Sequence, residues 1–188
     1  MSKRETCSVC TRPQTQCYCD SISVYENSLP TLLIRHIRES SHPFNTGRMA
    51  ALTYKNFKLI ESNDPNLHKV INDFINEYNP FLLFKTQSSL PISKEEINNH
   101  GAMIVLDGTW DKAKAILFAN KELQKLTQLH LQESKKSIYK SIRKACSEDF
   151  LSTFEAITSV YEMQESRSLE EQIKPLKTIV EQQRKWSP

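Results

Sequence analysis

Compact apolar runs alternate with amphipathic stretches along this chain. The apolar runs predict strands over residues 31–36, 57–60, 81–84 and 102–107, with another near 129–131. Amphipathic spacing predicts helices over 45–55 and 66–78, a short helix from residue 93, a helix from 109, and long helices from about 152 and 168. Strands that alternate with helices are typical of an α/β domain with a largely parallel sheet.

Polar residues with helix-capping chemistry precede three of the predicted helices. Asn45 is a natural N-cap, because its side-chain oxygen can accept from a free backbone N–H of the first turn. Ser93 with Glu96, and Ser152 with Glu155, have the spacing of capping boxes. These residues mark helix starts before any functional role is considered.

The strand predicted over 102–107 ends in a carboxylate at a sharp turn. Asp107 and Gly108 form the turn, and Thr109 and Trp110 open the next helix. The chain holds only three glycines, and one of them stands here. Because α/β proteins bind ligands at the carboxyl ends of their strands, beside helix N-termini, this segment is a candidate site.

Length, composition and missing motifs limit the classes of protein to which this chain can belong. With 188 residues, the chain can form one domain of ordinary size and a small appendage. It has no apolar run near the ~20 residues of a membrane helix, and its first residues lack the apolar core of a signal peptide, so a cytoplasmic location is expected. The absence of Gly-x-Gly-x-x-Gly, Walker and His-Glu-x-x-His motifs speaks against nicotinamide, ATP and catalytic-metal enzymes. The net charge of +3 permits a nucleic-acid partner.

Four cysteines lie close together near the N-terminus. Cys7 and Cys10 are separated by two residues, and Cys17 and Cys19 by one. Disulfides are rare in cytosolic proteins, whereas four thiolates at this density suit tetrahedral Zn²⁺. A shell of four cysteines has no open position, so this zinc would be structural. A redox-active cysteine pair and an iron–sulfur site are the alternatives.

Six motifs, in order and spacing, resemble those of the DTW-domain family of tRNA-uridine aminocarboxypropyltransferases, over roughly residues 7–160. They are Cys7-x-x-Cys10-x-x-Pro13 with Cys17-x-Cys19, His36-x-x-Glu39, Asn45-Thr46-Gly47-Arg48, Asp107-Gly108-Thr109-Trp110, Tyr139-x-x-x-Arg143-Lys144, and Leu151-Ser152-Thr153-x-Glu155-Ala156. The chain departs from the common family pattern at Ile37 and Lys85, where many members have proline.

The resemblance implies a SPOUT-like fold with a C-terminal knot, a zinc-binding module over 1–28 and a DTW catalytic domain over 29–188. It also implies transfer of the 3-amino-3-carboxypropyl group of S-adenosyl-L-methionine to N3 of a tRNA uridine, with release of 5′-methylthioadenosine. Two enzymatic alternatives are aminocarboxypropyl transfer to ribosomal RNA and methyl transfer. A third is a non-catalytic, zinc-bearing RNA-binding protein, which would have no need of Asp107 near an electronegative RNA.

Asp107 is the candidate general base for the N3 proton of uridine. It could instead bind the ribose or the amino group of S-adenosyl-L-methionine, or only stabilise its turn. The resemblance implies a cofactor pocket with these members: Asn45, Thr46, Gly47, Arg48, Leu106, Gly108, Thr109, Trp110, Ser152, Thr153 and Glu155.

Several of these residues have a plain structural alternative. Trp110 would be a wall for adenine or uracil, or would pack into the core beside Ala113 and Leu117. Arg48 would clamp an anion, or point into solvent from a capped helix. Thr109 would donate to the cofactor carboxylate or cap its helix, and Glu155 would bind the methionine ammonium or complete its capping box.

The candidate tRNA contacts are His36, Glu39, Lys135, Lys136, Tyr139, Lys140, Arg143 and Lys144. His36 follows the first predicted strand, where a side chain can reach the substrate or be a hydrogen-bonded loop residue. The basic run from Lys135 to Lys144 contains a tyrosine, which favours phosphate contact over a merely solvated face.

Overall fold

The computed structural model describes residues 5–42, 44–132, 137–138 and 151–185. Its centre is one parallel six-stranded sheet with strand order β2-β1-β5-β3-β6-β4. The strands are β1 (Thr31–Arg35), β2 (Phe57–Glu61), β3 (Phe81–Leu83), β4 (Leu90–Pro91), β5 (Met103–Asp107) and β6 (Gln128–His130). The predicted α/β class and parallel sheet are thereby confirmed.

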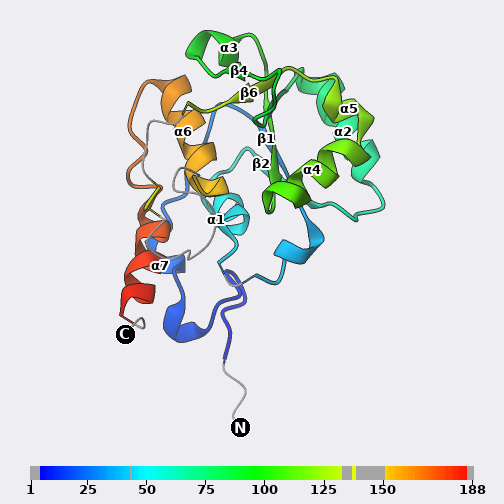
Figure 1. Cartoon of the computed structure of the whole chain (residues 1–188). Coiled ribbons are helices and arrows are strands. Elements are labelled where there is room, and N and C mark those ends of the chain that lie inside the picture. The colour runs from blue at the N-terminus through cyan, green and yellow to red at the C-terminus, as the bar shows by residue number, and fades with distance from the viewer. Residues whose placement is uncertain (1–4, 43, 133–136, 139–150, 186–188) are drawn as a thin grey trace.

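Helices cover both faces of this sheet (Figure 1). They are α1 (Thr46–Thr53), α2 (Leu67–Tyr78), α3 (Lys94–Asn98), α4 (Trp110–Ala119), α5 (Lys121–Gln124), α6 (Thr153–Glu165) and α7 (Lys174–Arg184), with short 3-10 helices at Gln14–Gln16, Cys19–Ser21 and Ile37–Glu39. The core of one face includes Leu33 and residues of α1, α6 and α7. The core of the other includes Leu32 and Ile34 with residues of α2, α4 and α5.

The central strands are apolar because helices bury them from both sides. Every residue of β1 and β5 is buried, whereas the edge strand β2 is largely half-buried. Helix α2 buries Leu67, Ile71 and Phe74, which recur at helical spacing as the sequence predicted.

The last helix begins later than predicted. The pattern placed its start near Ser168, but α7 begins at Lys174 with Pro175 in its first turn. Proline lacks a backbone N–H and is tolerated only at the start of a helix, so residues before it form turns instead. Leu169 is nevertheless buried in the core of the α6 and α7 face.

Two further predictions concern the organisation of the chain. Residues 139–150, between β6 and α6, lie outside the described residues, so the C-terminal knot stays a prediction. The division at residue 28 also stays a prediction, although Cys10 and Tyr18 share one apolar cluster with Leu33 of β1. Within the described ranges, no helix combines the length and apolar character needed to cross a bilayer.

Candidate functional site

The candidate site lies where the connections of two neighbouring strands diverge. Arg35 and Asp107, the last residues of β1 and β5, are paired in register. The chain leaves β1 for α1 on one face of the sheet and leaves β5 for α4 on the other. Such a switch point opens a crevice at the carboxyl ends of parallel strands, which is where ligands bind in this architecture.

Asp107 is held by two helix starts that are distant in sequence. Thr153, the first residue of α6, donates its hydroxyl to Oδ1 at 2.6 Å. Asn45, the N-cap of α1, donates its amide Nδ2 to Oδ2 at 3.0 Å. Both carboxylate oxygens therefore have fixed directions, and only 5% of the residue is exposed.

The surroundings of Asp107 raise its pKa above the ordinary value. Burial is the largest cause, and the nearby charge of Glu39 acts in the same direction. The hydrogen bonds from Thr153 and Asn45, and the charge of Arg35, act against it. A carboxylate with a raised pKa is a stronger base once ionised, so this environment suits proton abstraction.

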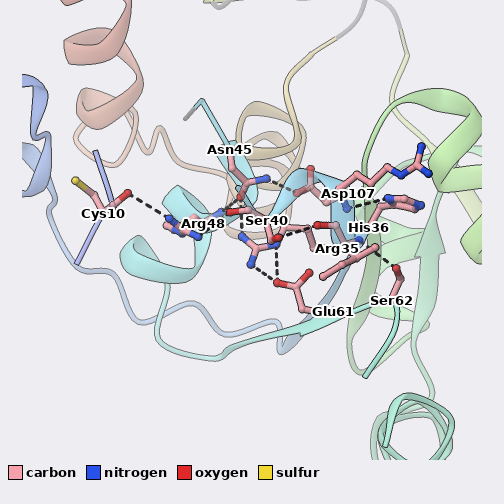
Figure 2. A network of polar contacts seen from close by, with 11 residues as sticks. Cys10, Arg35, His36, Ser40, Asn45, Arg48, Glu61, Ser62 and Asp107 are labelled. Atoms are coloured by element: carbon pink, nitrogen blue, oxygen red, sulfur yellow. Dashed lines mark hydrogen bonds and ion pairs between the residues drawn. The ribbon is translucent and has the colours of Figure 1, made fainter. Parts of the chain in front are cut away.

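The amide of Asn45 is oriented from its other end (Figure 2). Its Oδ1 accepts from the backbone N–H of Arg48 at 2.7 Å and from Nη1 of Arg35 at 3.1 Å. These two donors require an oxygen at that position, so the NH₂ group faces Asp107. The predicted N-cap is confirmed, and the same side chain also positions the carboxylate.

Arg35 and Glu61 are site residues that sequence reasoning missed. Nε of Arg35 donates to Oε1 of Glu61 at 3.1 Å, and Nη2 contacts the same oxygen. Arg35 is only 6% exposed. A charged residue at the end of an otherwise apolar strand was the available signal, because a buried guanidinium needs a partner.

Gly47 lies against the same carboxylate. A Cβ atom added to Gly47 would be 2.5 Å from Oδ2 of Asp107 and 2.7 Å from Cδ2 of Leu33. Real Cβ atoms do not approach so closely, so any side chain here would displace Asp107, Leu33 or α1. Gly47 therefore allows α1 to pack directly on the end of β5.

We expect Gly47→Ala to destabilise the protein by about 1–3 kcal/mol through overpacking. Alanine favours a helix over glycine by about 1 kcal/mol, so the steric effect must exceed that gain. Urea unfolding measures the difference. Ala51→Gly in the same helix is the control, because it reports helix propensity without this contact; a Gly47→Ala protein as stable as the wild type would contradict the close approach.

Arg48 points away from Asp107, toward the N-terminal cysteines. Its guanidinium donates to the carbonyl oxygens of Ser40 at 3.0 Å and Cys10 at 3.4 Å (Figure 2). It thus joins α1 to two loops. Anion binding by Arg48 stays a prediction, and in this structure its nitrogens bind backbone carbonyls instead.

Glu155 completes the capping box predicted at the start of α6. The Ser152 hydroxyl accepts from the Glu155 N–H, and the Glu155 carboxylate accepts from the Ser152 N–H at 2.8 Å. The carboxylate also accepts from the Ser137 hydroxyl at 2.8 Å and the Ile138 N–H at 2.7 Å. The capping role is confirmed, and a role toward a ligand stays a prediction.

The loop after β1 brings His36 and Glu39 beside the site. Nδ1 of His36 accepts from the N–H of Arg38 at 3.2 Å, which caps the short helix there. Glu39 is buried, and its Oε1 accepts from Nζ of Lys112 at 2.6 Å. Lys112 thereby ties α4 to this loop.

Trp110 is not a core residue. It is 44% exposed, whereas Ala113 and Leu117 of the same helix are buried. Its ring stacks on Phe84, with centroids 4.7 Å apart and planes 10° from parallel. The core alternative is therefore wrong, because Trp110 lies at the edge of the buried stripe of α4. Thr109 is the N-cap residue of α4, although its side chain makes no capping hydrogen bond.

The other predicted site residues fall in two groups. Thr46 and Leu106 are buried, and Gly108 lies between His36 and Lys112, so all three stand beside the strand ends. The predicted tRNA contacts Lys135, Lys136, Tyr139, Lys140, Arg143 and Lys144 lie outside the described residues.

The four N-terminal cysteines form a compact cluster. All four Sγ atoms lie within 4.8 Å of one another. The Cys7–Cys19 and Cys10–Cys17 sulfur pairs are each 3.7 Å apart. A tetrahedral Zn²⁺ with Zn–S bonds of 2.3 Å separates its sulfurs by about 3.8 Å, so the cluster fits this ion.

The pKa values of the cluster's thiols are shifted in opposite directions, because burial raises those of Cys17 and Cys19 whereas backbone hydrogen bonds lower that of Cys7. N–H groups of Cys10 and Val9 point at the Cys7 sulfur and lower the pKa of that thiol to about 6. The cluster is tied to the main domain through the Cys10 carbonyl, which accepts from Arg48, and the Cys17 carbonyl, which accepts from Gln182 of α7 at 3.3 Å.

Comparison with known proteins places this amino-acid sequence in a family. A curated protein from Drosophila melanogaster, "tRNA-uridine aminocarboxypropyltransferase 2", is 26% identical over 194 aligned residues, which cover 97% of this chain and 76% of that protein. No solved structure matches. The sequence model of the DTW domain matches residues 4–184, nearly the whole chain. The protein therefore belongs to the DTW domain family.

Proposed function

We propose that this protein transfers the 3-amino-3-carboxypropyl group of S-adenosyl-L-methionine to N3 of a tRNA uridine. The observation that carries the proposal is Asp107, a buried carboxylate with a raised pKa that is held at the strand switch point by Asn45 and Thr153. The name of the Drosophila relative supplies the reaction and the tRNA.

Asp107 would act as general base on the uridine. It takes the N3 proton, and the freed N3 electron pair attacks the γ-carbon of the methionine portion. The bond between this carbon and the sulfonium sulfur breaks, and its electrons stay on sulfur. The products are the N3-substituted uridine and neutral 5′-methylthioadenosine, so charge and atoms balance.

Three helix starts surround the site where this chemistry would occur. Asn45 and Thr153 connect the N-termini of α1 and α6 to Asp107, and α4 begins three residues after it. Helix N-termini favour negative charge, which suits the carboxylate of the methionine portion. The half-exposed Trp110 offers a flat apolar face for adenine or uracil.

A zinc ion would have a structural role here. Cys7, Cys10, Cys17 and Cys19 would be its four ligands, which leaves no position for a substrate. The ion would hold together a segment whose carbonyls anchor Arg48 and Gln182.

The deciding experiment incubates the purified protein with S-adenosyl-L-methionine and an unmodified tRNA transcript. Nucleoside mass spectrometry is expected to detect uridine with the added aminocarboxypropyl mass, and the small-molecule fraction is expected to contain 5′-methylthioadenosine. Release of S-adenosylhomocysteine would establish methylation instead. Product on ribosomal RNA but not on tRNA would identify ribosomal RNA as the substrate. If the protein binds RNA but forms no product with either RNA, the non-catalytic alternative is favoured.

A further inference from the structure

Two exposed aromatic rings lie along one flank of α4. Among the described residues, Trp110 and Phe118 are the aromatic side chains that combine large size with high exposure, at 44% and 69%. They are eight residues apart, and the exposed Lys114 stands midway between them. The spacing i, i+4, i+8 places all three on neighbouring positions of one helix flank.

The Trp110 ring, which is nearer to the candidate site, is held by contacts with neighbouring side chains. Phe84, which is buried, supports Trp110 by parallel stacking. Nζ of Lys114 lies 5.4 Å from the centroid of the Trp110 ring, within cation–π range. This end of the flank begins three residues after Asp107, so the flank leads away from the candidate active site.

We propose that Trp110, Lys114 and Phe118 form a stacking ridge for unpaired nucleotides of the RNA substrate. Alternation of aromatic rings and cations is how sequence-tolerant binders of single strands work, because every base has a π-face and every nucleotide a phosphate. Over eight residues the helix rises about 12 Å. Stacked bases are about 3.4 Å apart, so the two rings meet different nucleotides.

The charge of the ridge agrees with this partner. Lys114 is exposed, and its ammonium, which lies over the Trp110 ring, supplies a cation for a phosphate of a bound strand. The acidic Asp111 of the same helix stands in its first turn, before Lys114 along the chain. The choice of tRNA as the natural ligand rests on the proposed function, whereas the stacking of unpaired bases rests on the ridge itself.

Phe118 is the residue that tests the ridge, because it lies far along α4 from Asp107. We expect Phe118→Ala and Phe118→Leu to weaken binding of an unmodified tRNA transcript at least about fivefold. Phe118→Tyr should keep the affinity, because it keeps the ring. KM for tRNA should rise correspondingly, while turnover at saturating tRNA and KM for S-adenosyl-L-methionine stay unchanged. Fluorescence anisotropy and steady-state kinetics measure these quantities.

Two further arms sharpen the test. A labelled single-stranded oligouridine should show the same loss in Phe118→Leu, whereas an RNA duplex should show none. Lys114→Gln should reduce the salt dependence of binding by about one phosphate contact. Val24→Ala is the control for loss of exposed apolar surface, since Val24 is 59% exposed and lies outside the ridge.

The outcomes separate the ridge from the proposed reaction. Unchanged RNA binding in both Phe118→Ala and Phe118→Leu would overturn the ridge, whatever the activity of the wild type. If a Phe118 variant without RNA sediments differently from the wild type but still binds RNA normally, the ridge is also overturned, and this flank is a protein interface instead. Loss of RNA binding in a protein that forms no aminocarboxypropyl product would support the ridge and contradict the reaction.

Discussion

Replacing Asp107 with alanine is expected to lower turnover by about 10²–10⁴-fold, the usual contribution of a general base. Binding of S-adenosyl-L-methionine should be largely kept. The physical reason is that N3 of uridine becomes a good nucleophile only once its proton has a base to accept it. Single-turnover kinetics at saturating substrate measure the chemical step, and equilibrium dialysis measures binding.

Two variants make this test specific. Asp107→Asn keeps the size of the side chain and an acceptor for Thr153 or Asn45, so its loss of activity reports the charge rather than a cavity. Asp73→Asn removes an exposed carboxylate on α2 that forms an ion pair with Lys69, and it should behave as the wild type. If Asp107→Ala loses affinity for the cofactor but retains turnover at saturation, Asp107 binds a substrate and is not the base.

The raised pKa of Asp107 predicts how activity and stability depend on pH. The base must be ionised, so kcat/KM should fall as pH drops through this pKa, and the acid limb should lie above the ordinary aspartate value of about 3.9. The same shift affects the free energy of unfolding. The stabilisation from the protonated Asp107 is complete below pH ~3.9 and is lost as the pH rises through the raised pKa. Asp107→Asn should therefore gain stability relative to the wild type across that rise, as measured by urea unfolding.

Replacing Cys7 and Cys10 together with serine is expected to abolish stoichiometric zinc and to destabilise the protein by at least several kcal/mol. Structural zinc contributes on the order of 10 kcal/mol to the folding of small metal-bound modules. Each kcal/mol lowers Tm by about 2–4 °C in a chain of this size. Elemental analysis of the purified protein and calorimetry provide the two measurements.

Val9→Ala is the matched control for the cysteine variants. Val9 lies between the two cysteines, and its side chain is 52% exposed, so zinc content and Tm should stay at wild-type values. Unchanged zinc in the double serine variant would refute the four-cysteine site. Detection of iron and sulfide in the wild-type protein would show that the four cysteines hold an iron–sulfur cluster and not zinc.

Local patterns predicted most of the elements and the starts of the helices with side-chain caps. The caps at Asn45, Ser93 and Ser152 all accept the expected backbone N–H, because capping depends on residues within three positions. The candidate site was also found from local signals, since Asp107 stands at the end of a buried strand and before a helix. Such signals survive folding because neighbours in sequence remain neighbours in space.

The contacts that define the site could not be predicted in this way. Arg35 with Glu61, and Trp110 with Phe84, each join residues 26 positions apart, and their pairing depends on strand order. Helical periodicity left Trp110 either in the core or in a ligand pocket, because it describes one helix and not what lies opposite that helix. The two-residue strand β4 is too short for any pattern to mark it.

The hydrogen bonds of Asp107 have a consequence for biosynthesis. Its two donors are 62 positions before it and 46 positions after it. A nascent chain whose β5 has just left the ribosome already contains Asn45, but its Thr153 is not yet translated. Until α6 has emerged and docked, Asp107 lacks one of these two hydrogen-bond donors, so the candidate site is complete only after Thr153 has been synthesised. Chains that end before α6 therefore lack the Thr153 contact to Asp107, even when β1 and β5 have paired.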